Sequence, residues 1–209
     1  MVRHTCTAYR RPVIGFLAMH RAPLLQMLED YLEVYPEDRV RVDHVRQFVR
    51  VHADCFERSC VEGHITGSAW ILSADYRQVL LAHHRKLNRW LQPGGHADGD
   101  PDPERVARRE AEEESGLTAF SSLPGHPGAL LLDIDVHIIP ARGTEPAHLH
   151  HDFRYLLIAR SGQQLRLSEE STALRWFDRN SLTEATTEES LLRVESKTRT
   201  LLAAVTATI

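Results

Sequence analysis

Cysteine is scarce in this 209-residue sequence, and what there is does not form a recognisable set. The three cysteines, Cys6, Cys55 and Cys60, are odd in number and lie in the first third of the chain. An odd set argues against a disulfide framework, and without a second pair there is no four-cysteine zinc site. We therefore expect reduced thiols and a cytoplasmic localisation.

Long apolar runs and an excess of positive charge are also missing. No stretch approaches the ~18 consecutive apolar residues of a membrane-spanning helix. The apolar run 13–19 behind Arg10 and Arg11 has only the minimum length for an export signal, and His20 and Arg21 interrupt it before any cleavage-like site. A formal net charge of -4 offers no broad basic surface, so polymeric nucleic acid is not an expected partner. Hydrophobic residues at 42% and charged residues at 26% predict a soluble, folded protein.

Two helices are predicted in the first sixty residues. Apolar residues recur at helical spacing from Leu24 to Tyr35, and Pro36 stops this pattern. A second helix is expected from about Asp43, with an apolar stripe made of Val45, Phe48, Val49, His52 and Phe56. We interpret residues 1–60 as an N-terminal helical extension whose stripes are packing surfaces, and which makes a homodimer attractive.

The following residues, 61–209, alternate between strand and helix patterns. Strands are expected at 68–73 and 77–83 as a hairpin, at 129–139, at 149–159 and near 174–177, with a last helix at 188–204. Another helix is expected at Pro103–Ser115, because Asp102 is a good N-cap and Gly116 suits a left-handed C-cap. The predicted fold class is therefore α/β in the broad sense, more narrowly α+β.

Three glutamates of the predicted helix 103–115 project together. Glu110, Glu113 and Glu114 fall within an arc of about 100° at the helical repeat. Like charges at this spacing repel each other, whereas a divalent cation reverses the sign of their interaction. Oxygen ligands suit hard ions such as Mg²⁺ or Mn²⁺. Arg109 is one turn before Glu113 and is expected to orient its carboxylate.

The segment around these glutamates resembles the Nudix box, G-x5-E-x7-R-E-U-x-E-E-x-G-U, in which U is apolar. Eight of the nine defined positions match, namely Gly95, Arg109, Glu110, Ala111, Glu113, Glu114, Gly116 and Leu117. The first glutamate of the box is replaced by Pro101. Acidic residues surround this gap, and Asp100 is the favoured substitute among Asp98, Asp100, Asp102 and Glu104.

This resemblance implies a MutT-like Nudix hydrolase domain at 61–209, with a mixed β-sheet sandwiched between α-helices. Members of the family typically cleave a nucleoside diphosphate linked to another moiety, with a divalent metal. The resemblance makes Glu110, Glu113, Glu114 and the Gly94 carbonyl the expected ligands of Mg²⁺ or Mn²⁺. Glu110 is also the candidate general base, so that Glu110, Glu113 and Arg109 form the expected catalytic set.

A second polar pattern follows in the strand predicted near residue 150. His148, His150, Asp152 and Arg154 share one face of that strand, because side chains alternate with a period of two. Alone, this pattern suggests a transition-metal site. Beside a Nudix box, we expect it to line the substrate cleft, with Arg154 on a phosphate and Asp152 as a ligand or base. An ordinary polar sheet face is equally plausible. Arg85 is a further candidate for phosphate binding.

Three other hypotheses stay open beside the hydrolase. A non-catalytic Nudix domain that binds or senses a nucleotide would predict an eroded box, yet the three glutamates and Arg109 are present. A Nudix-fold isomerase similar to isopentenyl-diphosphate isomerase needs an active-site cysteine, but Cys55 and Cys60 precede the predicted sheet. A transition-metal enzyme built on His148 and His150 is the third.

Overall fold

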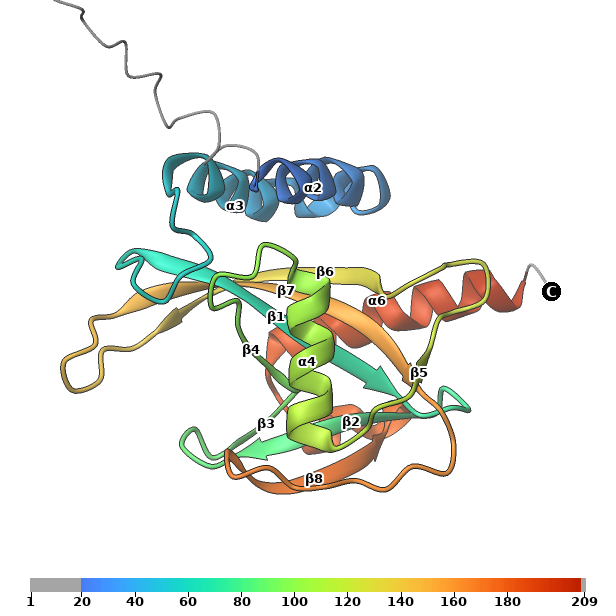
Figure 1. The fold of residues 1–209 in the computed structure, drawn as a ribbon. Coiled ribbons are helices and arrows are strands. Elements are labelled where there is room, and N and C mark those ends of the chain that lie inside the picture. Colours follow the sequence, from blue (N-terminus) through green and yellow to red (C-terminus); the bar gives the residue numbers. More distant parts are fainter. Residues whose placement is uncertain (1–19, 208–209) are drawn as a thin grey trace, which may run out of the picture.

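A mixed sheet forms the centre of the fold, with helices on both of its faces (Figure 1). The computed structural model describes residues 20–207. Its strands are β1 (Gly63–Leu72), β2 (Gln78–His84), β3 (Arg89–Leu91), β4 (Gly94–His96), β5 (Phe120–Ser121), β6 (Leu130–Ile139), β7 (His148–Ala159) and β8 (Ser171–Asp178). Its helices are α2 (Ala22–Val34), η1 (Pro36–Asp38), α3 (Arg39–Val51), α4 (Pro103–Ser115), η2 (Arg179–Ser181), α5 (Leu182–Ala185) and α6 (Glu189–Thr206). The predicted α+β class is confirmed.

The parallel pair β1 and β7 is the axis of the sheet. The two strands are in register from Gly63 opposite Leu149 to Leu72 opposite Ile158. Strand β6 is antiparallel to β7 on its other side. Strand β1 changes partner along its length, pairing with β4 in its middle and with β2 at its end. Strand β2 also pairs with β3 and β8, which form a second wing of the sheet.

Strand β1 begins earlier than the sequence predicts, at Gly63 instead of Ser68. The glycines at 63 and 67 resemble turn signals, yet Gly67 lies inside the strand. A Cβ at Gly67 would be 2.6 Å from the Pro103 carbonyl oxygen, so this glycine lets α4 cross β1 at close range. The short elements β5, η2 and α5 were not predicted.

Helix α3 also differs from its predicted bounds. It begins at Arg39 rather than near Asp43, and it ends at Val51, before Phe56. An ion pair between Asp38 and Arg41, at 2.7 Å, lies in its first turn and favours the earlier start. The periodic stripe continues past the helix because Phe56 is buried in the same core although it is not helical.

The helical extension packs onto the sheet of its own chain. The apolar stripes of α2 and α3 share one core cluster with Ile134, Phe153 and Tyr155 of β6 and β7, and with Val106 of α4. Figure 1 shows the α2–α3 pair lying across this end of the sheet. The surfaces that made a homodimer attractive are therefore covered within one chain. Among residues 20–207, no helix is long and apolar enough to cross a membrane.

A buried histidine lies between the extension and β7, and it makes stability depend on pH. The ring of His151 is fully buried and stacks on Phe48 at a centroid distance of 3.9 Å. Neither of its ring nitrogens has a hydrogen-bond partner among the described residues. Burial, together with the neighbouring His44, lowers the pKa of His151 to about 3. The folded state therefore holds this ring neutral.

We expect His151→Phe to reduce the acid sensitivity of folding. Because the folded-state pKa of His151 is depressed, its ring is protonated only in the unfolded chain, and stability is lost as pH falls from about 6.5 toward 3. One such group costs about 2 kcal/mol between pH 7 and pH 5. Urea unfolding at these two pH values should show a smaller difference in the variant. Equal differences in the two proteins would count against this role.

Candidate active site

Helix α4 begins and ends where the sequence predicts because both of its ends are capped. The Asp102 carboxylate accepts hydrogen bonds from the backbone N–H groups of Glu104 and Arg105. Pro103 occupies the first turn, and Gly116 ends the helix with a φ of 73°, which favours glycine. These local signals fix the start of the helix and thereby the face on which its glutamates lie.

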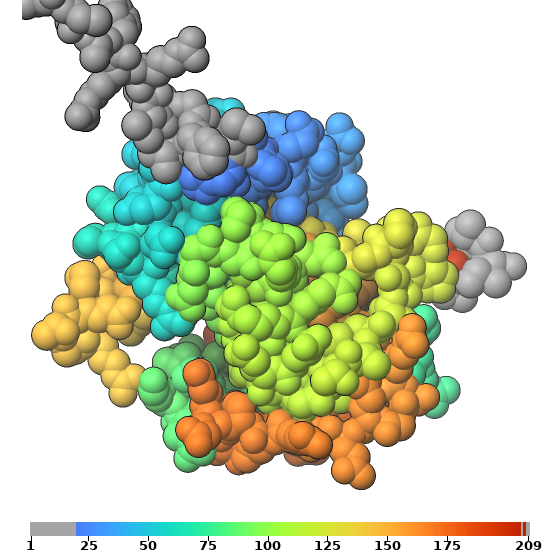
Figure 2. Space-filling view, viewed as in Figure 1, coloured from blue at the N-terminus to red at the C-terminus, as the bar shows by residue number. Residues whose placement is uncertain are grey.

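Small residues on one side of α4 bring the helix close to the sheet. Ala107 and Ala111 are fully buried. A Cβ on Gly67 of β1 would lie 2.9 Å from the backbone nitrogen of Ala107, so no larger residue fits there. Figure 2 shows the segment of α4 (green) at the surface, with the chain around residue 165 (orange) beside its end. The close packing of α4 on β1 therefore fixes the backbone that carries the glutamates.

Two of the three glutamates contact adjacent residues of β4. The Glu114 carboxylate accepts a hydrogen bond from the Gly94 N–H at 2.8 Å. A Cβ on Gly95 would lie 2.5–2.7 Å from the atoms of the Glu110 carboxylate, so only glycine leaves room for it. The Glu113 side chain is 64% exposed. The structure thus brings Glu110, Glu114 and Gly94 together, with Glu113 on the solvent side.

The two inner carboxylates are harder to ionise than ordinary glutamates. Burial raises the pKa of Glu114 to about 7, although the Gly94 N–H opposes this shift. Burial also raises the pKa of Glu110, against the opposing effect of Arg109. The negative charge of Glu170, just before β8, acts in the same direction on both. Sequence analysis missed Glu170, which only the fold brings near the box. Perturbed carboxylates of this kind are typical of functional sites.

Arg109 orients a different carboxylate from the one expected. Its Nη2 donates to Glu110 Oε1 and to the backbone carbonyl of His96, each at 2.7 Å. Its Nε lies 4.0 Å from Glu113, too far for a hydrogen bond. The predicted orientation of Glu113 by Arg109 is therefore corrected. The His96 carbonyl draws the guanidinium toward β4, where Glu110 is the nearer carboxylate.

We expect Gly95→Ala to lower hydrolytic activity with little loss of stability. Gly95 has no positive φ, so the added methyl strains no backbone and acts only by displacing the Glu110 carboxylate. A displacement of ~1 Å at a reacting group costs about 100-fold in rate. Steady-state kinetics and urea unfolding would measure the two effects. Wild-type activity in the variant would show that the position of Glu110 is unimportant.

The acidic residues near the missing box glutamate have other partners. Asp100 pairs with Arg105 and accepts the Asp102 N–H at 3.0 Å. Asp98 pairs with Arg58 at 2.5 Å. These contacts lie at the N-terminal end of α4, whereas the three glutamates occupy its last two turns. The substitution of the box glutamate by Asp100 stays a prediction without support from this geometry.

Asp152 and Arg154 belong to a buried network. Asp152 accepts hydrogen bonds from Thr66 Oγ1 at 3.0 Å, from Ser68 Oγ at 2.5 Å and from Arg154 Nε at 2.9 Å. Arg154 is 3% exposed and also contacts Asp135 at 3.1 Å. Their polar alternation is thus accounted for by mutual pairing. The predicted roles in phosphate and metal binding receive no support from these contacts.

His148 and His150 lie in a cluster with two further histidines. The ring of His64 on β1 is 4.9 Å from that of His148 and 4.8 Å from that of His150. The ring of His96, on β4, is 4.9 Å from His64 and 5.0 Å from His150. Sequence analysis missed His64 and His96 as partners, because only the parallel pairing of β1 with β7 sets His64 opposite His150.

Arg85 lies after the end of β2 and contacts the start of β8. Its guanidinium donates to the backbone carbonyls of Glu169 and Ser171, each at 3.0 Å. These bonds hold the residues that flank Glu170. The predicted contact of Arg85 with a phosphate stays a prediction, and the observed contacts describe a supporting role for the segment beside the box.

Neither cysteine in the described part of the chain lies among the glutamates. Cys55 and Cys60 are free thiols buried in the core that the extension shares with the sheet. Burial raises the pKa of Cys55 to about 12 and that of Cys60 to about 11, so both are protonated and unreactive. Cys6 lies outside the described residues. The isomerase hypothesis therefore gains no cysteine from residues 20–207.

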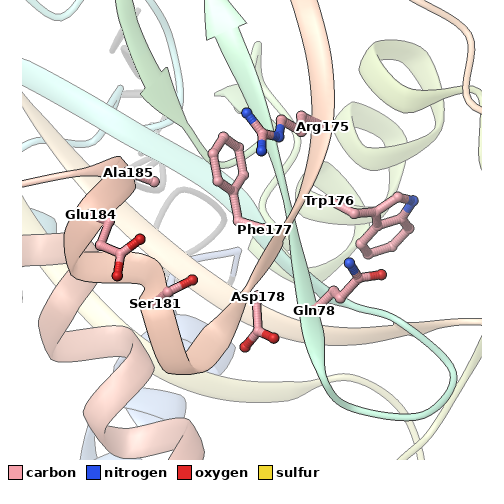
Figure 3. A pocket seen from close by; sticks show the side chains of 8 residues that line it. All are labelled: Gln78, Arg175, Trp176, Phe177, Asp178, Ser181, Glu184 and Ala185. Carbon is pink, nitrogen blue, oxygen red and sulfur yellow. The ribbon is translucent and has the colours of Figure 1, made fainter.

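A separate hollow lies on the second wing of the sheet, between β2, β8 and α5 (Figure 3). Its lining includes Gln78, Arg175, Trp176, Asp178 and Glu184. None of the residues predicted to bind metal or substrate is part of this lining. The hollow is therefore outside the candidate active site.

Two features are those of a phosphohydrolase domain of the Nudix type. One is the mixed sheet, and the other is the glutamate-bearing helix α4 in contact with Gly94 and Gly95 of β4. The family model described as NUDIX domain matches residues 64–195, which is more than half of the chain. The protein belongs to the Nudix family. This membership, with the glutamates and Arg109 of the box in position, supports the predicted pyrophosphohydrolase class.

A solved structure with a TM-score above 0.5 has the same fold. An Ap4A hydrolase from C. elegans, in a binary complex, has 17% identity and a TM-score of 0.54, covering 67% of this chain and 98% of that one. A Nudix family hydrolase from Clostridium perfringens has 25% identity and a TM-score of 0.49, covering 66% and 97%. At 17% identity, the likeness to the C. elegans structure concerns the fold and not the substrate. No curated protein matches the chain.

Proposed function

We propose that the protein is a divalent-metal-dependent hydrolase that cleaves a phosphoanhydride bond in a nucleoside diphosphate linked to another moiety. Mg²⁺ is the proposed metal, and Mn²⁺ is an alternative. The observation that carries the proposal is the placement of the box glutamates beside β4: Glu114 accepts the Gly94 N–H, the Glu110 carboxylate lies against Gly95, and Glu113 is exposed on the same helix. A small-molecule nucleotide derivative is the proposed partner.

The chemistry of these donors fits a hard cation. All four candidate ligand groups offer oxygen atoms, which Mg²⁺ and Mn²⁺ prefer. Burial and mutual repulsion raise the pKa of Glu114 to about 7, and a bound cation would favour its ionised form. Glu113 is exposed and faces solvent, where a diphosphate arrives. The donor set therefore fits the metal that the resemblance implies.

The side chains of the site have different proposed roles in hydrolysis. A divalent cation held by Glu113 and Glu114 would supply charge neutralisation of the diphosphate oxygens and would lower the pKa of a water molecule. Glu110 would accept a proton from the attacking water as the water oxygen bonds to one phosphorus and the bridging P–O bond to the leaving phosphate breaks; the raised pKa of Glu110 suits this role. Arg109 holds the Glu110 carboxylate against the His96 carbonyl, so that the base keeps its orientation. Glu113 and Glu114 hold the cation.

A mass-spectrometric hydrolysis screen tests this proposal. Nucleoside triphosphates, nucleotide sugars, dinucleoside polyphosphates and coenzymes are incubated with the full chain and Mg²⁺ or Mn²⁺, or with a chelator. Turnover that requires metal supports the hydrolase and identifies its substrate class. Tight retention of an uncleaved nucleotide, with no turnover of any compound, would instead support a nucleotide sensor.

We further propose a cytoplasmic protein that does not bind polymeric nucleic acid. Support comes from the buried, unpaired thiols of Cys55 and Cys60 and from the net charge of -4. The homodimer remains a prediction, and size-exclusion chromatography with light scattering tests it.

A further inference from the structure

The histidine cluster is distinct from the carboxylates of the box and suits a different kind of ion. Its members come from three strands, with His64 on β1, His96 on β4 and His150 on β7. One nitrogen of each ring lies within 4.8 Å of the others. A tetrahedral zinc site with Zn–N distances of about 2.0–2.1 Å separates its ligand atoms by about 3.4 Å. Small ring movements therefore close the three nitrogens around one ion.

We propose that His64, His96 and His150 bind one divalent transition-metal ion, with Zn²⁺ as the representative ion, at a site separate from the glutamates of α4.

Unpaired buried nitrogens are the first support for this site. Both ring nitrogens of His64 and the Nε2 of His150 are buried and lack a hydrogen-bond partner among the described residues. Buried polar groups in folded proteins are almost always satisfied, so such a concentration of exceptions indicates a ligand. Carboxylates are absent from this trio, and imidazole nitrogens suit Zn²⁺, Cu²⁺ or Ni²⁺ rather than Mg²⁺.

His148 lies beside this trio, with its ring 4.9 Å from that of His64 and 5.3 Å from that of His150. Its Nδ1 is 3.0 Å from the Pro146 carbonyl oxygen, which only accepts hydrogen bonds, so the proton is on Nδ1. The lone pair is then on Nε2, which is buried and has no hydrogen-bond partner in the described chain. A backbone carbonyl on the second ring nitrogen is the usual arrangement for a metal-binding histidine.

The site would stabilise the strand that carries the box glycines. Strand β4 has three residues, and among the strands of residues 20–207 it pairs with β1 alone. An ion on His64, His96 and His150 would tie β4 to both central strands, next to Gly94 and Gly95. Metal binding is then expected to raise the melting temperature of the chain, since the ion binds the folded state.

Equilibrium dialysis of the chelator-treated full chain against Zn²⁺, in excess Mg²⁺, tests the proposal. We expect one bound Zn²⁺ per chain. Because loss of a supporting residue costs 10–100-fold in affinity, His96→Gln should weaken binding at least about 100-fold. His126→Gln is the matched control, since His126 lies in a loop outside the cluster. Glu113→Gln should also retain the Zn²⁺, which separates this site from the proposed hydrolase metal.

Two outcomes would overturn the proposal. One is the absence of stoichiometric Zn²⁺ in the wild type, and the other is Zn²⁺ that is lost in Glu113→Gln but kept in His96→Gln. X-ray absorption at the zinc edge of the wild type covers the case in which His96→Gln fails to fold. Imidazole scattering from at least three ligands is expected there, and a shell of oxygen ligands alone would refute the site.

Discussion

Glu113→Gln is expected to lower metal-dependent hydrolysis about 1000-fold, because a bound metal contributes several kcal/mol to the transition state and 1.36 kcal/mol is a factor of ten. The amide keeps the size of the side chain but removes the charge that holds the cation. Since Glu113 is 64% exposed, the free energy of unfolding should change by no more than about 0.5 kcal/mol. Initial rates at saturating Mg²⁺, beside urea unfolding, measure the two effects.

Glu112→Gln is the matched control for this substitution. Glu112 is an exposed neighbour on the same helix, but its position is not one of the defined positions of the box. Glu112→Gln removes one negative charge from α4, as Glu113→Gln does. A general electrostatic effect would therefore lower the activities of the two variants equally. Near wild-type turnover in Glu112→Gln would assign the loss to position 113. Equal losses in the two variants would remove Glu113 from the metal site.

Helix α4 was predictable because its signals are local in sequence. Asp102 caps the N-terminus of the helix, Pro103 occupies its first turn, and Gly116 ends it in a left-handed conformation. These are the positions that the three residue types favour. The positions of Glu110 and Glu114 on a common side follow from the helical repeat alone. Their contact with β4 does not, because it depends on the close packing of α4 against β1.

Contacts between strands were the part that the sequence did not reveal. A period of two predicts that Asp152 and Arg154 share a face, but not which residues pack against that face. In the structure, Arg154 donates to the Ser190 carbonyl of α6 and contacts Asp135 of the neighbouring strand β6. His64 and His150 lie far apart in sequence and meet only because β1 and β7 pair in parallel. The local sequence pattern therefore predicts which face of a strand a side chain lies on. The pairing of the strands determines which other side chains it contacts.

Asp133→Asn should destabilise the fold by about 3 kcal/mol, the lower end of the cost of breaking a buried ion pair, because each of its cations keeps a second carboxylate. Asp133 is fully buried on β6. Its carboxylate contacts Arg193 at 2.8 Å and Lys197 at 2.9 Å, both on α6, and Arg154 lies 3.6 Å away. Lys197 continues the network to Asp38 of the extension. The asparagine keeps the size but leaves these cations without their central anion. Urea unfolding at pH 7 measures the loss.

The comparison that isolates the buried charge uses an exposed ion pair and a double variant. Arg89 and Glu188 form a pair at 2.8 Å with side chains 62% and 35% exposed, and Glu188→Gln should cost no more than about 1 kcal/mol. Arg193→Met removes one of the cations that Asp133 neutralises. If the uncompensated charge is the cause, Asp133→Asn combined with Arg193→Met will cost less than the sum of the single variants. Additive losses would instead assign the effect to packing, and the network would then not explain how α6 and the extension are held to the sheet.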